Sequence, residues 1–76
     1  MLFYIQHDSD VPINEQIVTQ VTFGIASGVL EQGALIPSVR DLAGQLVVHP
    51  NTVAKAYQKL EQQGVITARR DRKSVV

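Results

Sequence analysis

The stretch from Ile36 to Gly64, IPSVRDLAGQLVVHPNTVAKAYQKLEQQG, contains one apolar pattern twice. The spacing i, i+3, i+4, i+7 occurs at Val39, Leu42, Ala43 and Leu46, and again at Val53, Ala56, Tyr57 and Leu60. This spacing places each set on one face of an amphipathic helix. Between the sets, Pro50 suits the first turn of a new helix, where its missing N–H has no partner to lose. The stretch predicts two short helices joined by a tight turn, a helix-turn-helix.

The ends of these two helices are also marked in the sequence. Ser38 is the expected N-cap of the first helix, which should run to about Leu46. The second helix has capping groups available in His49, Asn51 or Thr52. It should continue to Gln63, since Gly64 can take the left-handed conformation that closes a helix.

Upstream, a further helix is expected to begin near Pro12, a first-turn proline, and to end at Ser27-Gly28. Apolar residues at steps of four form a ridge along it: Ile13, Ile17, Val21 and Ile25. We expect the apolar sets of the helix-turn-helix to pack on this ridge.

Short strands are predicted at both ends of the chain. Residues 2–5 are β-prone, and residues 29–36 are expected to be a connector. After Gly64, residues 65–68 predict a strand, residues 69–73 a basic turn and residues 74–76 a returning strand. The predicted fold is mainly α with a small β-hairpin: a winged helix-turn-helix of three helices plus a wing.

Composition excludes several classes of protein. A chain of 76 residues forms one domain, and 45% apolar residues are too many for a disordered tail. No apolar run approaches the roughly 20 residues of a membrane span, and the N-terminus does not resemble a signal peptide, so a cytoplasmic protein is predicted. Without cysteine there are no disulfides or thiolate metal sites. No nucleophile with a base, paired carboxylates or phosphate loop suggests an enzyme, and no cofactor is expected.

Charge is unevenly distributed although the net charge is zero. Residues 1–37 contain four acidic residues and no Lys or Arg, whereas residues 38–76 contain all seven basic residues against three acidic ones. The balance is therefore −4 in the first part and +4 in the second. A phosphate backbone would meet the second part, so the pattern favours DNA as the partner.

Several ordered motifs resemble one known family. The runs PINEQI (12–17), PSVRDLA (37–43) and HPNTVAKAYQKLEQQG (49–64), with the closing SVV, are similar to the N-terminal DNA-binding domain of GntR-family bacterial transcription regulators. The run PNTVAKAY is most similar to the YtrA subfamily. The resemblance covers nearly the whole chain from Leu2 to Val76. It implies a sequence-specific regulator of transcription, a repressor that binds an inverted repeat of double-stranded DNA as a homodimer.

The resemblance also implies which residues meet the duplex. Residues 1–76 would be the DNA-binding domain of a longer regulator, whose C-terminal region dimerises or binds an effector of unknown identity. In the family the Arg of the PSxR motif, here Arg40, contacts DNA, and the start of the second helix enters the major groove. The full set of candidate DNA-binding residues is Ser38, Arg40, His49, Asn51, Thr52, Lys55, Arg69, Arg70, Arg72 and Lys73.

The chain departs from the family pattern at two places. Pro50 and Ala54 occupy positions where family members often have Arg, so base readout falls to Asn51, with Lys55 at the flank. Asp71 and Lys73 occupy the wing's usual glycine positions, which argues against a tight wing tip entering the minor groove. The basic residues of the wing would then contact phosphates.

Each candidate also has a simpler interpretation. Arg40 and the basic run 69–73 are favoured as DNA contacts over plain solvated charges. Asn51 can cap a helix or pair with adenine, and contact with DNA is favoured. His49 can be a poor N-cap, a phosphate ligand when protonated, or neither. Tyr57 is expected in the core, with its hydroxyl at the edge.

Two other readings remain open for the whole chain. A winged helix can instead be a protein-interaction module that binds no duplex, and an exposed apolar patch on the second paired helix would favour that reading. The isolated domain can also pair or swap through its N-terminal strand. The cluster His7, Asp8 and Asp10 is expected to be a polar turn rather than a metal site, because no second cluster completes a ligand shell.

Overall fold

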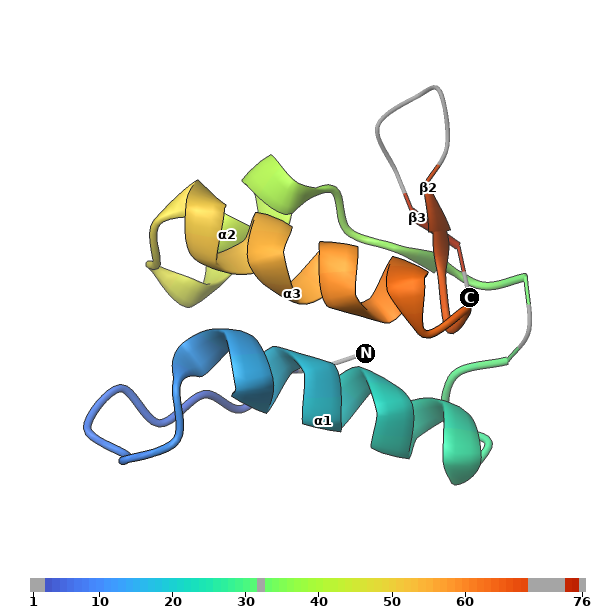
Figure 1. Ribbon diagram of the computed structural model, residues 1–76, viewed down its shortest axis with the longest axis horizontal. Coiled ribbons are helices and arrows are strands. Elements are labelled where there is room, and N and C mark those ends of the chain that lie inside the picture. The colour runs from blue at the N-terminus through green and yellow to red at the C-terminus, as the bar shows by residue number, and fades with distance from the viewer. Residues whose placement is uncertain (1–2, 32, 69–73, 76) are drawn as a thin grey trace.

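Three helices and a small sheet follow one another in a computed structural model that describes residues 3–31, 33–68 and 74–75 (Figure 1). Their order is α1 (Ile13–Ala26), β1 (Leu35–Ile36), α2 (Val39–Leu46), α3 (Pro50–Gln62), β2 (Thr67–Ala68) and β3 (Ser74–Val75). Helix α3 packs against both α1 and α2, and the sheet lies beyond the C-terminal end of α3. The predicted winged helix-turn-helix is confirmed.

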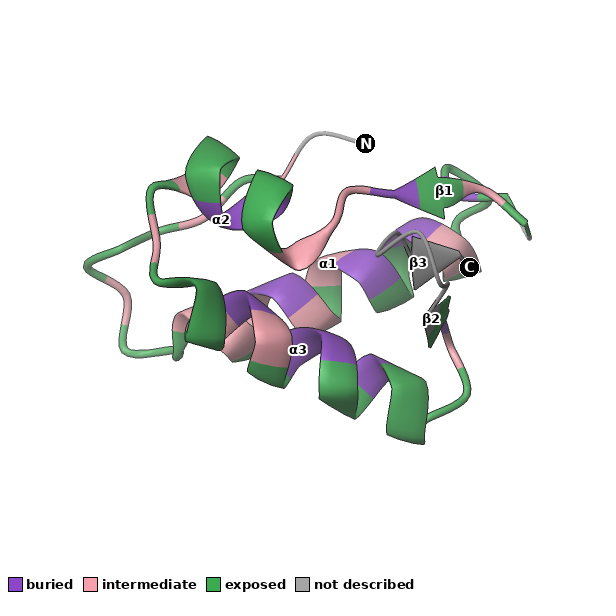
Figure 2. Ribbon diagram, turned by 90° about the horizontal axis from the view of Figure 1, so that it is seen from above, coloured by how far each residue is buried: buried purple, intermediate pink, exposed green. Residues whose placement is uncertain are grey.

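One apolar cluster joins the three helices. Ile17 and Val21 of α1 have no exposed surface, and Ile13 and Ile25 pack half-buried against the same cluster, so the predicted ridge is confirmed. The other buried side chains of the cluster come from α2, α3, β1 and two connecting segments: Leu30, Ile36, Leu42, Ala43, Val53, Ala56, Tyr57, Leu60 and Ile66. Figure 2 shows these buried positions turned inward along each helix. Since α3 packs on both other helices, the core fixes the orientation of its outer face.

The helices begin and end within one residue of their predicted positions. Pro12 precedes α1 as its N-cap with ψ of 144°, one position earlier than a first-turn proline. Gly28 follows the C-cap Ser27 with φ of +82°, and Gly64 follows the C-cap Gln63 with φ of +74°. Both glycines take the left-handed conformation that favours residues without a Cβ.

The sheet has three strands rather than the two of a hairpin. Its order is β1-β3-β2, and both pairings are antiparallel, with Leu35 opposite Val75 and Thr67 opposite Val75. The prediction that residues 29–36 form only a connector is wrong at its end, because Leu35–Ile36 pairs with the second edge of β3. Strand β2 also begins two residues later than predicted, because the N–H of Val65 donates to the carbonyl of Leu60 at 2.9 Å and so belongs to the turn that ends α3.

The predicted N-terminal strand is wrong for the residues described. Residues 3–6 belong to no strand, and side-chain amides of α1 take the place of a neighbouring strand. The Gln20 amide accepts from the backbone N–H of Tyr4 and donates to its carbonyl, and the Gln16 amide does both for Gln6, at 2.9 Å each. The backbone groups that a pairing strand would use at these two residues are therefore already bonded.

Candidate nucleic-acid interface

A tight turn sets the angle between α2 and α3. Val47, the C-cap of α2, takes the left-handed conformation with φ of +55°, and the N–H of Val48 donates to the carbonyl of Ala43 at 3.0 Å. A β-branched residue is strained in this conformation, and the Val47 side chain is 84% exposed, so packing does not offset the strain. The turn brings the start of α3 close to the start of α2.

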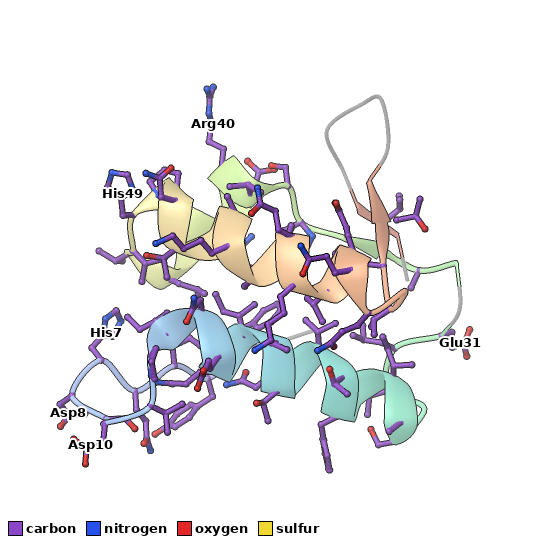
Figure 3. The ribbon with its side chains drawn as sticks, in the orientation of Figure 1. His7, Asp8, Asp10, Glu31, Arg40 and His49 are labelled. Atoms are coloured by element: carbon purple, nitrogen blue, oxygen red, sulfur yellow. The ribbon has the colours of Figure 1, made fainter. Side chains whose placement is uncertain are left out.

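The start of α2 is organised by Ser38, as predicted. Its hydroxyl accepts from the N–H of Asp41 at 3.1 Å, and its carbonyl accepts from the N–H of Leu42 at 2.9 Å. The N–H groups of Val39 and Arg40 precede this first intrahelical bond, so helix geometry gives them no partner within α2. The Arg40 side chain is exposed and points away from the body of the molecule (Figure 3). A guanidinium therefore stands at the positive end of the helix dipole.

The start of α3 is organised by His49. Its ring Nδ1 accepts from the N–H of Asn51 at 3.1 Å, and its carbonyl accepts from the N–H of Thr52 at 3.0 Å. Pro50 is the first helical residue and has no N–H. The first-turn amides of α3 are thus already bonded, and contacts with a ligand at this end must come from side chains.

The two helix starts border one open groove. Ser38, Val39, Arg40 and Pro50 line it, and its volume is about 440 Å³. Because the N-terminal ends of α2 and α3 both meet here, their dipoles favour an anionic group in the groove. Arg40 adds a full positive charge at its rim.

The outer face of α3 is polar along its length. Asn51 and Lys55 are exposed there, whereas Thr52 and Ser38 are half-buried. The other exposed polar side chains of this helix are Gln58, Lys59, Glu61 and Gln62. Figure 2 shows this exposed side of α3 opposite its buried stripe. Spacings of four residues place Asn51, Lys55 and Lys59 in one row, and sequence reasoning overlooked Lys59.

Tyr57 links α3 to the start of α2. Its ring is 3% exposed, and its hydroxyl donates to the carbonyl of Pro37 at 2.7 Å, one residue before the Ser38 cap. Burial raises the pKa of the Tyr57 hydroxyl above its ordinary value, so it stays a donor. The prediction of a core tyrosine is confirmed, and its hydroxyl ties the middle of α3 to the segment that precedes α2. No pattern in the sequence identified Pro37 as its partner.

Some of the other residues considered in the sequence do not lie at the groove between the starts of α2 and α3. Arg69, Arg70, Arg72 and Lys73 lie outside the described residues. His7, Asp8 and Asp10 lie by the start of α1, at the same end of the molecule as His49 but on the α1 side (Figure 3). Within residues 3–31, 33–68 and 74–75, no three His, Cys, Asp or Glu side chains are grouped so as to hold a metal ion, and no helix is long and apolar enough to cross a membrane.

Comparison with known proteins identifies relatives of the whole fold. The model of the family described as bacterial regulatory proteins, gntR family, matches residues 13–76. The chain is 48% identical over 58 residues to the HTH-type transcriptional regulator Rv1152 of Mycobacterium tuberculosis, covering 76% of this chain and 48% of that protein. It is 44% identical over 64 residues to the HTH-type transcriptional repressor YtrA of Bacillus subtilis, covering 84% of this chain and 49% of that protein.

A solved structure agrees with these relatives. YtrA from Sulfolobus acidocaldarius, a GntR-family transcription factor, superposes with a TM-score of 0.90 at 39% identity, over 100% of this chain and 80% of that one. The chain spans about half the length of the curated relatives that it matches.

Proposed function

Because the chain belongs to the GntR family of bacterial regulatory proteins, which are regulators and not enzymes, we propose that it binds double-stranded DNA sequence-specifically and represses transcription. Residues 1–76 act as the DNA-binding domain of a longer, cytoplasmic regulator. The observation that carries this proposal is the convergence of two helix N-termini and Arg40 on one open groove, beside the polar outer face of α3.

The chemistry of α3 favours a duplex over a protein partner. A protein-docking face needs an exposed apolar patch, and the large exposed apolar side chains of the described residues all lie outside α3: Tyr4, Val11, Phe23, Val29, Leu35 and Val47. The exposed side chains of α3 after Pro50 are amides and charged groups, which match base edges and phosphates.

Each candidate residue then has a role. Asn51 enters the major groove and reads a base, since its amide can pair bidentately with adenine. Arg40 at the start of α2 and Lys55 on the outer face of α3 bind phosphates and fix the register. Half-buried Thr52 and Ser38 support these contacts, and His49 lies at the same edge. Further phosphates are bound by the basic residues of the wing, Arg69, Arg70, Arg72 and Lys73.

The full-length regulator binds an inverted repeat as a homodimer. Pairing through the edge of the N-terminal segment that Tyr4 and Gln6 form is an unsuitable route to this dimer, because Gln20 and Gln16 already bond their backbone. In this proposal a region beyond the domain dimerises and also binds the effector.

Selection from a randomised duplex pool at low salt tests this function, with the enriched duplexes then titrated over a salt series. We expect one enriched half-site and an affinity that falls steeply with salt, because cationic side chains displace counterions from the phosphates. A folded chain that enriches no sequence and binds no duplex at any salt would contradict the proposal.

A further inference from the structure

The two nitrogens of the His49 ring have different surroundings. Nδ1 accepts a hydrogen bond from the N–H of Asn51 at 3.1 Å, so it must carry a lone pair and no proton. The proton of the neutral ring is then on Nε2, and the imidazole is exposed and points away from the body of the molecule (Figure 3). The helix cap thereby fixes the tautomer and leaves one N–H donor facing outward.

This donor lies where α3 lacks free main-chain donors. Pro50 has no N–H, and the N–H groups of Asn51 and Thr52 are both taken by His49 itself. At the first turn of α3, main-chain donors cannot meet an acceptor on a ligand, although the groove lined by Arg40 and Pro50 lies next to it. The Nε2–H of His49 is the donor that takes their place.

We infer that His49 contacts the duplex as a neutral donor through Nε2–H while Nδ1 caps α3, a role that rests on the proposed function. The acceptor is a phosphate oxygen or an acceptor on a base edge in the major groove, such as N7 or O6 of guanine, which offer the same hydrogen-bonding chemistry. Protonation of Nδ1 would set two donors against each other at the cap, so phosphate binding by a charged His49 would cost the helix its cap. His49 can cap α3 and contact the duplex at the same time only when its ring is neutral.

A synthetic chain separates the two roles, since 76 residues are within reach of chemical synthesis. Replacing His49 by its Nε2-methyl derivative removes the outward proton and keeps the Nδ1 lone pair. A second variant, His49→Asn, keeps a good capping oxygen on a shorter side chain. His49→Ala removes both functions. The same methylation at His7, which lies on the α1 side of the molecule, is the matched control (Figure 3).

Binding to a selected duplex is followed by fluorescence anisotropy over a salt series at about pH 8, where ordinary imidazoles are uncharged. We expect Nε2-methylation and His49→Asn to keep the thermal midpoint and to lower affinity about three- to tenfold, the effect of one neutral hydrogen bond. The salt slope, which is the slope of the logarithm of affinity against the logarithm of salt concentration, should not change, because a neutral donor displaces no counterion. His49→Ala should lower both the midpoint and the affinity, and methylated His7 neither.

The possible outcomes are distinguishable. Equal loss on all duplexes assigns the acceptor to phosphate, and loss confined to one base pair assigns it to an acceptor on a base edge of that pair. Unchanged affinity after methylation would show that His49 is only a cap, and a salt slope smaller by about one would show a charged phosphate contact instead. If the wild-type chain binds no duplex, the proposed function fails together with this role. Binding by the wild type and equally by both cap-keeping variants would refute the His49 contact alone.

Discussion

The outer faces of α1 and α3 differ in chemistry although the two helices pack on each other. On α1 the exposed surface includes the aromatic ring of Phe23, 70% exposed, and the carboxylate of Glu15. On α3 it consists, after Pro50, of amides and charged groups without a large apolar side chain, with Asn51 and Lys55 at the end that borders the groove. Both helices bury the same kind of apolar stripe. The residues on the buried face of a helix therefore indicate the fold, and those on its exposed face indicate what kind of partner the helix contacts.

Core truncation should have the largest effect and should not distinguish the two helices. Ile17 and Leu60 are fully buried in one cluster, so Ile17→Ala and Leu60→Ala should each lower the free energy of unfolding by about 2–5 kcal/mol. Urea denaturation measures this, with exposed Phe23→Ala as the control, expected within about 0.5 kcal/mol of wild type. Loss for one core variant only would contradict a shared core.

Removal of the Tyr57 hydroxyl should have the next largest effect. Tyr57→Phe leaves the carbonyl of Pro37 without this donor and should cost about 1–3 kcal/mol of unfolding free energy. The pKa of the Tyr57 hydroxyl is raised in the folded state above its value of about 10 in the unfolded chain. The contribution of Tyr57 to the free energy of unfolding is therefore complete below pH 10 and declines as the pH rises above 10, where the unfolded chain ionises first.

Urea titrations on both sides of pH 10 check this sign. The gap in stability between wild type and Tyr57→Phe should narrow as the pH rises. A gap that widens would show that the folded state favours the ionised hydroxyl.

Replacement of one charge on each face should separate local contact from net charge. Arg40→Gln should weaken duplex binding about tenfold and lower the salt slope by about one, because a phosphate contact is lost. Glu15→Gln on α1 changes the net charge by the same amount in the other direction. It should leave both quantities near wild type in anisotropy titrations at moderate salt. Equal and opposite shifts would mean that only net charge matters.

Relief of backbone strain in the turn before α3 should have the smallest effect. Val47→Asn places a residue that tolerates the left-handed conformation at an exposed position and should raise the free energy of unfolding by up to about 1 kcal/mol. The control Val29→Asn changes an exposed valine without positive φ and should give no gain. Thermal melts of the two variants compare them directly, and equal midpoints would refute stored strain.

The helices and their ends were predictable because their causes are local. The spacing of Val53 to Leu60, the cap at Ser38 and the glycine after Gln63 act within a few residues of chain, and each was confirmed. The candidate residues at the starts of α2 and α3 follow instead from the resemblance of their motifs to the GntR family. Their roles in DNA binding stay predictions.

The errors came from partners distant in the sequence. Residues 3–6 have β propensity, but glutamine amides sixteen and ten residues away bond Tyr4 and Gln6. Leu35–Ile36 has a weak strand pattern and becomes β1 only because β3 returns beside it. The bond from Tyr57 to Pro37 spans twenty residues. Local propensity does not contain these contacts, and tertiary structure decides them.

Amide chemical shifts recorded during titration of the ¹⁵N-labelled chain with a selected duplex test most directly which face meets DNA. We expect the largest changes at Val39–Asp41 and at Asn51–Lys55, and none on the exposed face of α1 from Thr19 to Ala26. Changes confined to α1, with the starts of α2 and α3 unaffected, would contradict this expectation.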